Sequence, residues 1–496
     1  IIYLESKGYS VTPVNSGNDA IEILESSKFD LVFLDENMPG LSGLETLNLI
    51  KKMRPNLSVI MITKNEEESI MEEAIGSKIS DYLIKPVNPN QILLSIKKNI
   101  DTHRLVEEKN TRDYQIDFRN ISMSLSSSLD YRGWIEIYKK IVYWELELEK
   151  SNDKSIEEIL SMQKIEANSQ FFRFIKENYA SWMKGDDMPL LSHNLFRKKV
   201  SPLIDNIPTY FIVIDNLRYD QWKVIEPIIL DDFVLEEEDM YYSILPTATQ
   251  YSRNAIFSGL LPLEMERRFS DKWKNDEDQG GKNMYEQDFL VDQLQRLGKG
   301  DAKYSYNKIT QLDIGRKVVS KVPNMALNDI NVIVYNFVDM LSHARTDMKV
   351  IKELADDDAA YRSLTLSWFE HSPLLDIMKE IAKQDANIVI TTDHGTINVN
   401  KPTKIIGDRS VNSNLRYKQG KNLQYKDSDV FAIGDPESYF LPKQNVSSKY
   451  IFAKEDMYFV YQNNYNQFVN LYRNTYQHGG VSMEEMLIPI ITLTTK

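Results

Sequence analysis

Four short, mostly apolar runs, each followed closely by an aspartate, constrain the fold of this chain more than any other feature. Residues 29–34, 210–214, 330–338 and 387–392 are rich in Ile, Val, Leu and Phe, and they lead to Asp35, Asp215, Asp339 and Asp393. Runs of this length and composition predict buried strands. Helical patterns separate them, which favours doubly wound parallel sheets, and such sheets carry their chemistry at the carboxyl ends of the strands. We therefore expect an α/β protein whose polar side chains gather at strand ends.

Length and composition bound the class of protein. A chain of 496 residues is too long for one core, so two or three domains are expected. The absence of cysteine excludes disulfides and thiolate zinc sites, and it favours a reducing, cytoplasmic setting. No apolar run approaches the roughly 20 residues of a membrane span. The net charge of -14 argues against general coating of nucleic acid, because phosphates are neutralised by Lys and Arg.

The first hundred residues alternate between strand and helix patterns. We expect the end of a Gly-capped helix at 1–8, a helix at 18–24, and strands at 9–15, 29–35, 58–63 and 81–86. Asp35, Thr63 and Lys85 lie at the ends of three of these strands. A carboxylate, a hydroxyl and an ammonium group that converge there predict a phosphoryl-accepting site. Asp35 would be the nucleophile, while Lys85 and a magnesium ion neutralise the phosphoryl charge.

This segment resembles the receiver domain of two-component response regulators, which has a CheY-like, doubly wound fold. The matching residues are the run Asp-Glu-Asn-Met-Pro-Gly at 35–40, then Thr63, Tyr82 and Lys85-Pro86. The resemblance implies that Asp35 accepts a phosphoryl group from a sensor histidine kinase and, with the backbone of Asn37, holds Mg²⁺. Thr63 and Tyr82 would be the switch pair, and Lys85 would stabilise the phosphoryl group. The family's first strand, with an acidic pair that binds Mg²⁺, would precede Ile1, so the magnesium site is incomplete in this sequence.

Residues 104–200 show apolar side chains at helical spacing, notably in 135–148, 156–160 and 171–180. They predict a bundle of helices joined by short polar loops, which would act as a spacer between a switch and an effector. The aromatic residues Tyr131, Trp134, Tyr143 and Trp144 favour core positions over ligand sites. Dimer contacts are also compatible with this region.

A nucleophile candidate lies in the segment after about residue 201. We expect a strand over 242–249 that leads into a helix over 250–259. The amino terminus of a helix offers free N–H groups to a phosphate. Thr249 is better placed there than Thr247, because it directly precedes the helical run.

Three histidines complete a metal-binding pattern with the aspartates. Asp215, Asp339 and Asp393 supply carboxylates, and His343, His394 and His478 are three of the six histidines of the chain. This number of O and N ligands suits two sites of tetrahedral type, and two metals about 4 Å apart can clamp an attacking and a leaving oxygen. Three imidazoles among the ligands favour zinc over manganese. The other three histidines fit solitary polar positions.

Residues from about 201 resemble the PglZ domain of the alkaline phosphatase superfamily. Pro246-Thr-Ala-Thr249 and Phe-Ser-Gly-Leu-Leu-Pro at 257–262 are similar to the nucleophile segment of its nucleotide pyrophosphatase/phosphodiesterase branch, and the later metal motifs follow in order. The resemblance implies two Zn²⁺ ions, one on Asp339, His343 and His478, the other on Asp215, Thr249, Asp393 and His394. Thr249 would form a covalent phosphothreonine that water then hydrolyses. Asn254 and Arg218 remain open candidates for contacts with a phosphate oxygen.

The expected organisation is a receiver at 1–103, a helical spacer at 104–200 and a PglZ domain at 201–496. This order resembles response regulators linked to type IX secretion. The function it implies is a zinc phosphodiesterase for nucleotides or oligonucleotides, with phosphomonoester hydrolysis as the nearby alternative. A second hypothesis is a docking module with little turnover that binds a secretion-motor protein or a sigma factor.

Three further expectations concern partners. Phosphorylated chains are expected to form a homodimer through the receiver and spacer. Stable binding of duplex DNA is disfavoured, because no basic recognition helix follows the receiver. The basic run 401–426 either attracts a polyanionic substrate or forms a solvated loop.

Overall fold

The computed structural model shows two compact units, residues 1–117 and 118–496, which we describe separately. It describes residues 2–55, 57–64, 79–150, 154–185, 188–205, 207–276, 278, 280–336, 357–407, 412, 414–443 and 445–496. None of the helices in these ranges is long and apolar enough to cross a lipid bilayer.

The first unit is an α/β sandwich around a parallel sheet in the order β1-β2-β3. Its elements are α1 (Ile2–Glu5), α2 (Gly17–Ser26), β1 (Leu31–Asp35), α3 (Gly43–Met53), β2 (Ser58–Thr63), β3 (Asp81–Ile84), α5 (Pro89–Ile96), a π-helical turn (Lys97–Asp101) and α6 (Thr102–Leu125), which runs on into the second unit. Leu34, Leu47 and Met61 belong to its core. The structure therefore confirms the Gly-capped helix end predicted at 1–8, the helix predicted at 18–24 and three of the four predicted strands.

The predicted strand at 9–15 is wrong. These residues follow Gly8, whose φ of 88° ends the first helix, and they have no regular structure. A strand needs a neighbour that takes its backbone hydrogen bonds, and in the described ranges no strand pairs with this segment. Pro13 also removes one donor from it.

A six-stranded sheet forms the centre of the second unit, in the order β5-β16-β8-β4-β7-β6. Its strands are β4 (Thr209–Ile214), β5 (Phe233–Tyr242), β6 (Tyr304–Ile309), β7 (Ile330–Tyr335), β8 (Asn387–Thr391) and β16 (Leu487–Thr495). β8, β4, β7 and β6 are parallel, while β16 is antiparallel to both of its neighbours. The side chains that follow β8, β4 and β7 therefore meet at the carboxyl ends of these strands. The α/β fold class is confirmed.

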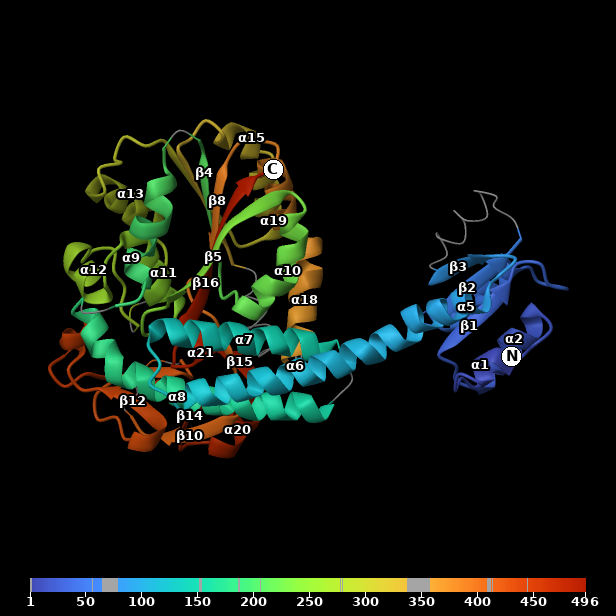
Figure 1. Cartoon of the computed structure of the whole chain (residues 1–496). Helices are drawn as coiled ribbons and strands as arrows, with labels where there is room; N and C mark the ends of the chain where they lie inside the picture. The colour runs from blue at the N-terminus through green and yellow to red at the C-terminus, as the bar shows by residue number, and fades with distance from the viewer. Residues whose placement is uncertain are drawn as a thin grey trace. The chain divides into compact units, whose positions relative to one another are not determined.

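Helices cover both faces of this sheet (Figure 1). On one side lie α9 (Ser192–Leu195), α11 (Thr249–Ser258), α12 (Pro262–Arg268) and α13 (Glu286–Arg296), and on the other α10 (Tyr219–Leu230), α18 (Asp358–Glu370) and α19 (Pro373–Ile381). Shorter helices are a π-helical turn (Phe196–Val200), a 3-10 turn (Ser201–Leu203), α14 (Leu312–Val319), α15 (Val322–Met325), α20 (Tyr465–Tyr472) and α21 (Met483–Met486).

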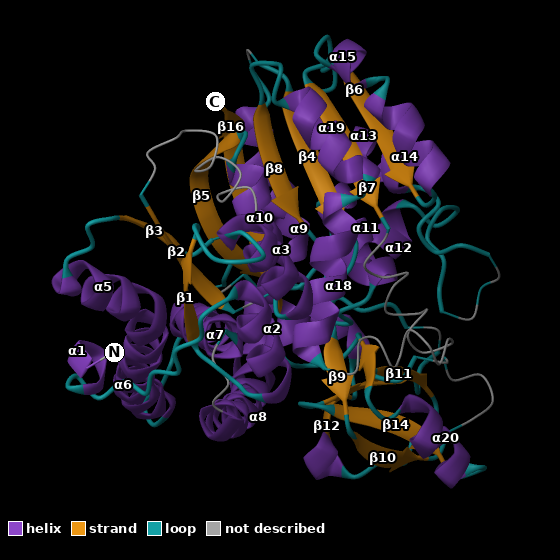
Figure 2. Cartoon of the chain, turned by 90° about the vertical axis from the view of Figure 1, so that its right-hand side faces the viewer, coloured by secondary structure: helices purple, strands orange, loops and turns teal. Residues whose placement is uncertain are grey.

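Three small sheets form a subdomain beyond the carboxyl ends of β4 and β8 (Figure 2). They pair β9 (Ile397–Val399) with β15 (Thr475–Gln477), β10 (Lys401–Ile405) with β14 (Met457–Tyr461), and β13 (Lys449–Ala453) with β11 (Tyr417–Gly420) and β12 (Val430–Ile433); two 3-10 turns (Asp427–Asp429, Pro436–Tyr439) flank β12. The loop after β15 carries His478 back towards the main sheet.

The predicted strand over 242–249 is displaced in the structure. β5 spans Phe233–Tyr242, and the chain leaves the sheet before α11 begins at Thr249. The acidic residues 236–239 interrupt the apolar pattern from which a strand would be predicted. They are tolerated because β5 lies at the edge of the sheet, where much of the strand is exposed to solvent.

The predicted spacer helices are α7 (Tyr131–Glu149) and the long α8 (Lys154–Met183), which joins two predicted segments. Both pack against the central domain within the second unit. Phe171 and Trp182 contact the ring of Tyr242 with centroid distances of 6.2 and 5.1 Å, and the Tyr179 hydroxyl accepts the Leu245 N–H at 2.7 Å. These helices are therefore part of the core of the unit that contains the candidate active site.

Candidate active site

The receiver unit brings its predicted phosphoryl-accepting residues together. Asp35 and Thr63 are the last residues of β1 and β2, Lys85 follows β3, and the strand register places all three at the same edge. The Lys85 ammonium group forms an ion pair with the Asp35 carboxylate, and the Asn37 N–H donates to Asp35 Oδ1 at 3.2 Å. The side chains of Asp35 and Lys85 are 35% and 31% exposed, so solvent and a phosphodonor can reach them. Thr63 is buried, and Tyr82 packs partly buried against the core.

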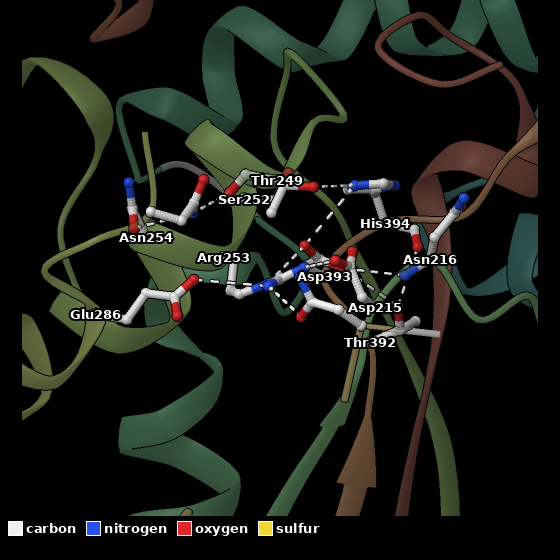
Figure 3. Close-up of polar contacts among 12 residues, drawn as sticks. Asp215, Asn216, Thr249, Ser252, Arg253, Asn254, Glu286, Thr392, Asp393 and His394 are labelled. Atoms are coloured by element: carbon white, nitrogen blue, oxygen red, sulfur yellow. Dashed lines mark hydrogen bonds and ion pairs between the residues drawn. The ribbon is translucent and has the colours of Figure 1, made fainter. Parts of the chain in front are cut away.

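In the second unit, residues from three distant segments converge at the edge of the central sheet (Figure 3). Asp215 follows β4, Asp393 and His394 follow β8, and Thr249 is the first residue of α11. One ligand atom each of Asp215, Asp393 and His394 lies within 4.8 Å of the other two, and all three residues are buried. Thr249 Oγ1 lies 3.0 Å from His394 Nε2 (Figure 3). Thr249 itself is only half-buried.

Local hydrogen bonds fix the tautomer of His394. Its Nδ1 lies 3.1 Å from the Gly395 carbonyl oxygen, which can only accept, so Nδ1 carries the proton. Nε2 then presents its lone pair to Thr249. Gly395 permits this turn, because a Cβ added there would lie 1.9 Å from the Glu484 carbonyl oxygen.

The carboxylate of Asp393 is ionised in this environment. Burial opposes its charge, but the Arg253 guanidinium and then His394 outweigh burial, so the pKa of Asp393 lies well below its usual range. The Asn216 N–H and the Thr392 hydroxyl also donate to Asp393 Oδ1, each at 3.3 Å.

Arg253 is the residue of this cluster that the sequence prediction missed. It lies one helical turn after Thr249 on α11, and its side chain is fully buried. Its guanidinium pairs with the Asp215 carboxylate and with Asp393 Oδ2, the latter at 3.0 Å. The i, i+4 spacing from Thr249 was a usable signal, because it places a cation on the face that meets the strand-end carboxylates.

His478, which was predicted as a ligand of the other zinc ion, lies beside the cluster. Its ring stacks on that of His394 with a centroid distance of 4.2 Å and an interplanar angle of 16°. The Thr247 hydroxyl accepts the Gly479 N–H at 3.0 Å and donates to the Gly480 carbonyl at 2.9 Å, which ties the His478 loop to the segment before α11. Asp339 and His343, the other two residues of the same predicted zinc site, lie outside the described residues.

Two open candidates for phosphate contacts are engaged elsewhere. Arg218 pairs with Asp220 and Asp358. Asn254 accepts from Asn283 at 3.2 Å and donates to the Lys282 carbonyl at 3.3 Å.

Within the described part of the basic run 401–426, residues 401–405 and 417–420 form β10 and β11. Arg416 is buried and forms two hydrogen bonds with Glu485, at 3.1 and 2.6 Å. Lys418 is also buried, and its ammonium group donates to the Asn412 carbonyl at 2.7 Å. These two cations cannot belong to a surface that attracts a polyanion.

The donors at the sheet edge fit a divalent metal ion. Two carboxylates and an imidazole with an unprotonated Nε2 are ligands that zinc prefers. They follow the neighbouring parallel strands β4 and β8, and one ligand atom of each lies within 4.8 Å of the others, which is close enough for a shared ion. His478 adds a second imidazole next to them.

Comparisons with known families agree with this arrangement. Three family models match successive segments: a response regulator receiver domain at 2–97, a PorX response regulator linker domain at 104–183, and a BREX system PglZ alkaline phosphatase-like domain at 195–493. The chain belongs to the PorX-type response regulators. As in that family, a receiver domain implies a phosphodonor such as a histidine kinase, and a PglZ domain implies a hydrolase of the phosphatase superfamily.

Curated relatives resemble only a short part of this PorX-type chain. The alginate biosynthesis regulator AlgB of Pseudomonas putida is 33% identical over 102 residues, 21% of this chain and 23% of that protein. A cyclic di-GMP phosphodiesterase of Thermotoga maritima is 31% identical over 94 residues, 19% of this chain and 25% of that protein. The chain thus spans about a quarter of the length of these relatives. A CheY-like receiver structure from Methanospirillum hungatei is 28% identical, with a TM-score of 0.20, and the match covers 21% of this chain and 82% of that one.

Proposed function

We propose that the second unit is a zinc-dependent phosphodiesterase that cleaves nucleotides or oligonucleotides, and that phosphorylation of Asp35 controls it. The observation that carries this proposal is the 3.0 Å contact between Thr249 Oγ1 and His394 Nε2, at a helix amino terminus and beside two buried carboxylates. The remaining donors of the proposed metal pair are His478 and, by resemblance, Asp339 and His343.

The chain's own groups prepare Thr249 for attack on phosphorus. Without a metal the hydroxyl donates to His394 Nε2 at 3.0 Å, which holds Oγ1 beside the atoms that would hold an ion. An ion bound to Nε2 would take this lone pair in place of the hydroxyl. The first N–H groups of α11 are available to the oxygens of a phosphate at this point. When bound, the ions would supply Lewis acidity and neutralise charge on the attacking and leaving oxygens.

The reaction then proceeds in two displacements. In the first, the Thr249 Oγ1–P bond forms as the bond from phosphorus to the leaving alcohol breaks, and the leaving oxygen takes up a proton. In the second, water attacks the phosphothreonine, restores the Thr249 hydroxyl and releases a phosphomonoester. Diesters are the preferred substrates of this proposal, because the segment around Thr249 is similar to that of the diesterase branch.

Thr249→Ala tests this assignment. The loss of the nucleophile is expected to lower diesterase turnover by at least about 10³-fold, while zinc content, measured by mass spectrometry of the metal, stays close to that of the wild type. Thr249→Ser is the matched control and should keep measurable turnover, since it retains the hydroxyl. Assays on bis(p-nitrophenyl) phosphate and p-nitrophenyl phosphate in parallel decide between diester and monoester preference. Wild-type turnover by Thr249→Ala would remove this residue from the mechanism.

A second candidate function rests on the nearly complete burial of the three clustered metal-ligand candidates. Asp215, Asp393 and His394 are 1%, 0% and 0% exposed, which also suits a metal that stabilises a docking domain. In that case the second unit would bind a secretion-motor protein or a sigma factor in type IX secretion, with little turnover. The half-buried Thr249 and His478 favour the enzyme, because a purely structural site has no use for an accessible hydroxyl. Docking would be supported if the Thr249→Ala variant bound the motor protein or sigma factor as well as the wild type did, without diesterase turnover.

A further inference from the structure

The guanidinium of Arg253 links the carboxyl ends of three adjacent parallel strands. Its Nη2 pairs with Asp215 after β4, and its Nε lies 3.0 Å from Asp393 Oδ2 after β8. Its Nη1 donates to Asn336 Oδ1, directly after β7, at 3.2 Å. β8, β4 and β7 are neighbours in the sheet. One side chain from α11 therefore connects all three strand ends, and Figure 3 shows its contacts with Asp215 and Asp393.

The charges around Arg253 do not balance without it. Glu286 lies 3.6 Å from Arg253 Nη1, but Lys308 already pairs with Glu286 at 2.9 Å. Asp215 and Asp393 both pair with Arg253, and Asp393 also lies 3.7 Å from the His394 ring. The two buried carboxylates therefore share the Arg253 guanidinium.

We propose that Arg253 is a built-in counter-cation, which holds Asp215 and Asp393 in place when no metal is bound and competes with the metal for their oxygens. This inference rests on the proposed metal site. It assigns Arg253 a positioning role, separate from any contact with substrate. A fork of N–H donors suits this role better than an ammonium group, since it serves two carboxylates at once.

Arg253→Gln should make the fold depend on metal. Removing one partner of a buried ion pair leaves uncompensated charge, so the melting temperature of the metal-free variant should fall by roughly 5 to 10 °C. Zinc would replace the lost charge, and the zinc-loaded variant should melt within about 2 °C of the zinc-loaded wild type. The zinc dissociation constant should decrease by about tenfold, because a nearby positive charge is gone.

The measurements are scanning calorimetry of chelator-stripped and zinc-loaded protein, and zinc titration in competition with a chromogenic chelator. Arg362→Gln is the matched control. Arg362 is also buried and shared between two carboxylates, Asp220 at 3.0 Å and Glu149 at 2.7 Å. That variant should lose similar stability with and without zinc. If Arg253→Gln does not fold in either state, Arg253→Lys is measured in the same way and should show a smaller loss that zinc restores.

Each outcome has a definite reading. Equal losses with and without zinc, an unchanged melting temperature of the metal-free variant, or an unchanged or higher dissociation constant would overturn the counter-cation role. If the wild type binds zinc and only the variant departs from expectation, this inference fails and the proposed function stands. If the wild type binds no zinc, both fail.

Discussion

Lys418 is a buried amine whose charge state couples stability to pH. Burial lowers its pKa to about 7, from an ordinary value near 10.5. Between about pH 7 and pH 10.5 the unfolded chain therefore binds one more proton at this residue than the folded chain does. The cost of burying the charged amine is largest at pH 7 and below. This cost disappears as the pH rises to about 10. Lys418→Met should therefore raise the free energy of unfolding by about 2 kcal/mol at pH 7, and by little at pH 10.

Urea denaturation at the two pH values checks this expectation. Lys421→Met is the control, since Lys421 is exposed in the same segment and its loss should shift both values equally. A Lys418→Met variant that gains nothing at pH 7 would show that the hydrogen bond to Asn412 and the contact with the Tyr461 ring fully offset burial.

At the residue scale, the sequence indicated the candidate metal ligands but not the buried arginine that pairs with their carboxylates. Asp215, Asp393 and His394 could be predicted, because each directly follows a strand-like apolar run. The spacing of Arg253 from Thr249 indicated the helix face on which it lies, but its carboxylate partners depend on how α11 docks on the sheet. Arg416 and Lys418 belonged, on sequence, to a basic surface run, and their burial follows from strand pairing between segments far apart in the chain.

At the scale of elements, the turn after β8 depends on the absence of a side chain at Gly395. A Cβ there would meet the Glu484 carbonyl oxygen of α21 at 1.9 Å, and backbone atoms cannot move aside cheaply. Gly395→Ala should destabilise the protein by about 1 to 3 kcal/mol and weaken zinc binding at least about tenfold, because His394 and Asp393 precede the displaced residue. Thermal unfolding and zinc titration test both effects. Gly434→Ala, at a position with open space within 4 Å, should change neither.

Sequence periodicity identified most elements but not their partners. α7, α11, β2 and β4 were expected almost as they occur, since their apolar spacing is regular. The edge strand β5 was misplaced because four of its ten residues carry acidic side chains. The docking of α8 could not be foreseen: Asn168 donates to the Glu484 carboxylate at 3.0 Å, across 316 positions of sequence, and accepts the Met483 N–H at 2.8 Å. Only the folded structure shows that the helices before the PglZ domain complete its core.

At the scale of the whole molecule, pairing of phosphorylated chains requires a contact surface on each chain. The helices of the second unit present exposed apolar side chains, with Met123 64%, Met162 63% and Ile165 50% exposed. Met162 also lines a groove between α6 and α8, together with Phe118 and Leu125. Exposed apolar side chains near such a groove are typical of a contact surface. We therefore expect phosphorylated chains to pair, with these helices in the interface.

Light scattering with beryllofluoride and Mg²⁺, a mimic of the phosphoryl group, tests this pairing. The molar mass is expected to double upon addition of the mimic, whereas Asp35→Asn stays monomeric because it lacks the acceptor carboxylate. Met162→Asp should also stay monomeric while its receiver still binds the mimic, since a charge in an apolar contact is expelled into water rather than buried. If Met162→Asp pairs as well as the wild type, the contact lies in the receiver alone. If the wild-type mass does not change with the mimic, phosphorylation acts within a single chain, and the metal site would have to respond without a second copy.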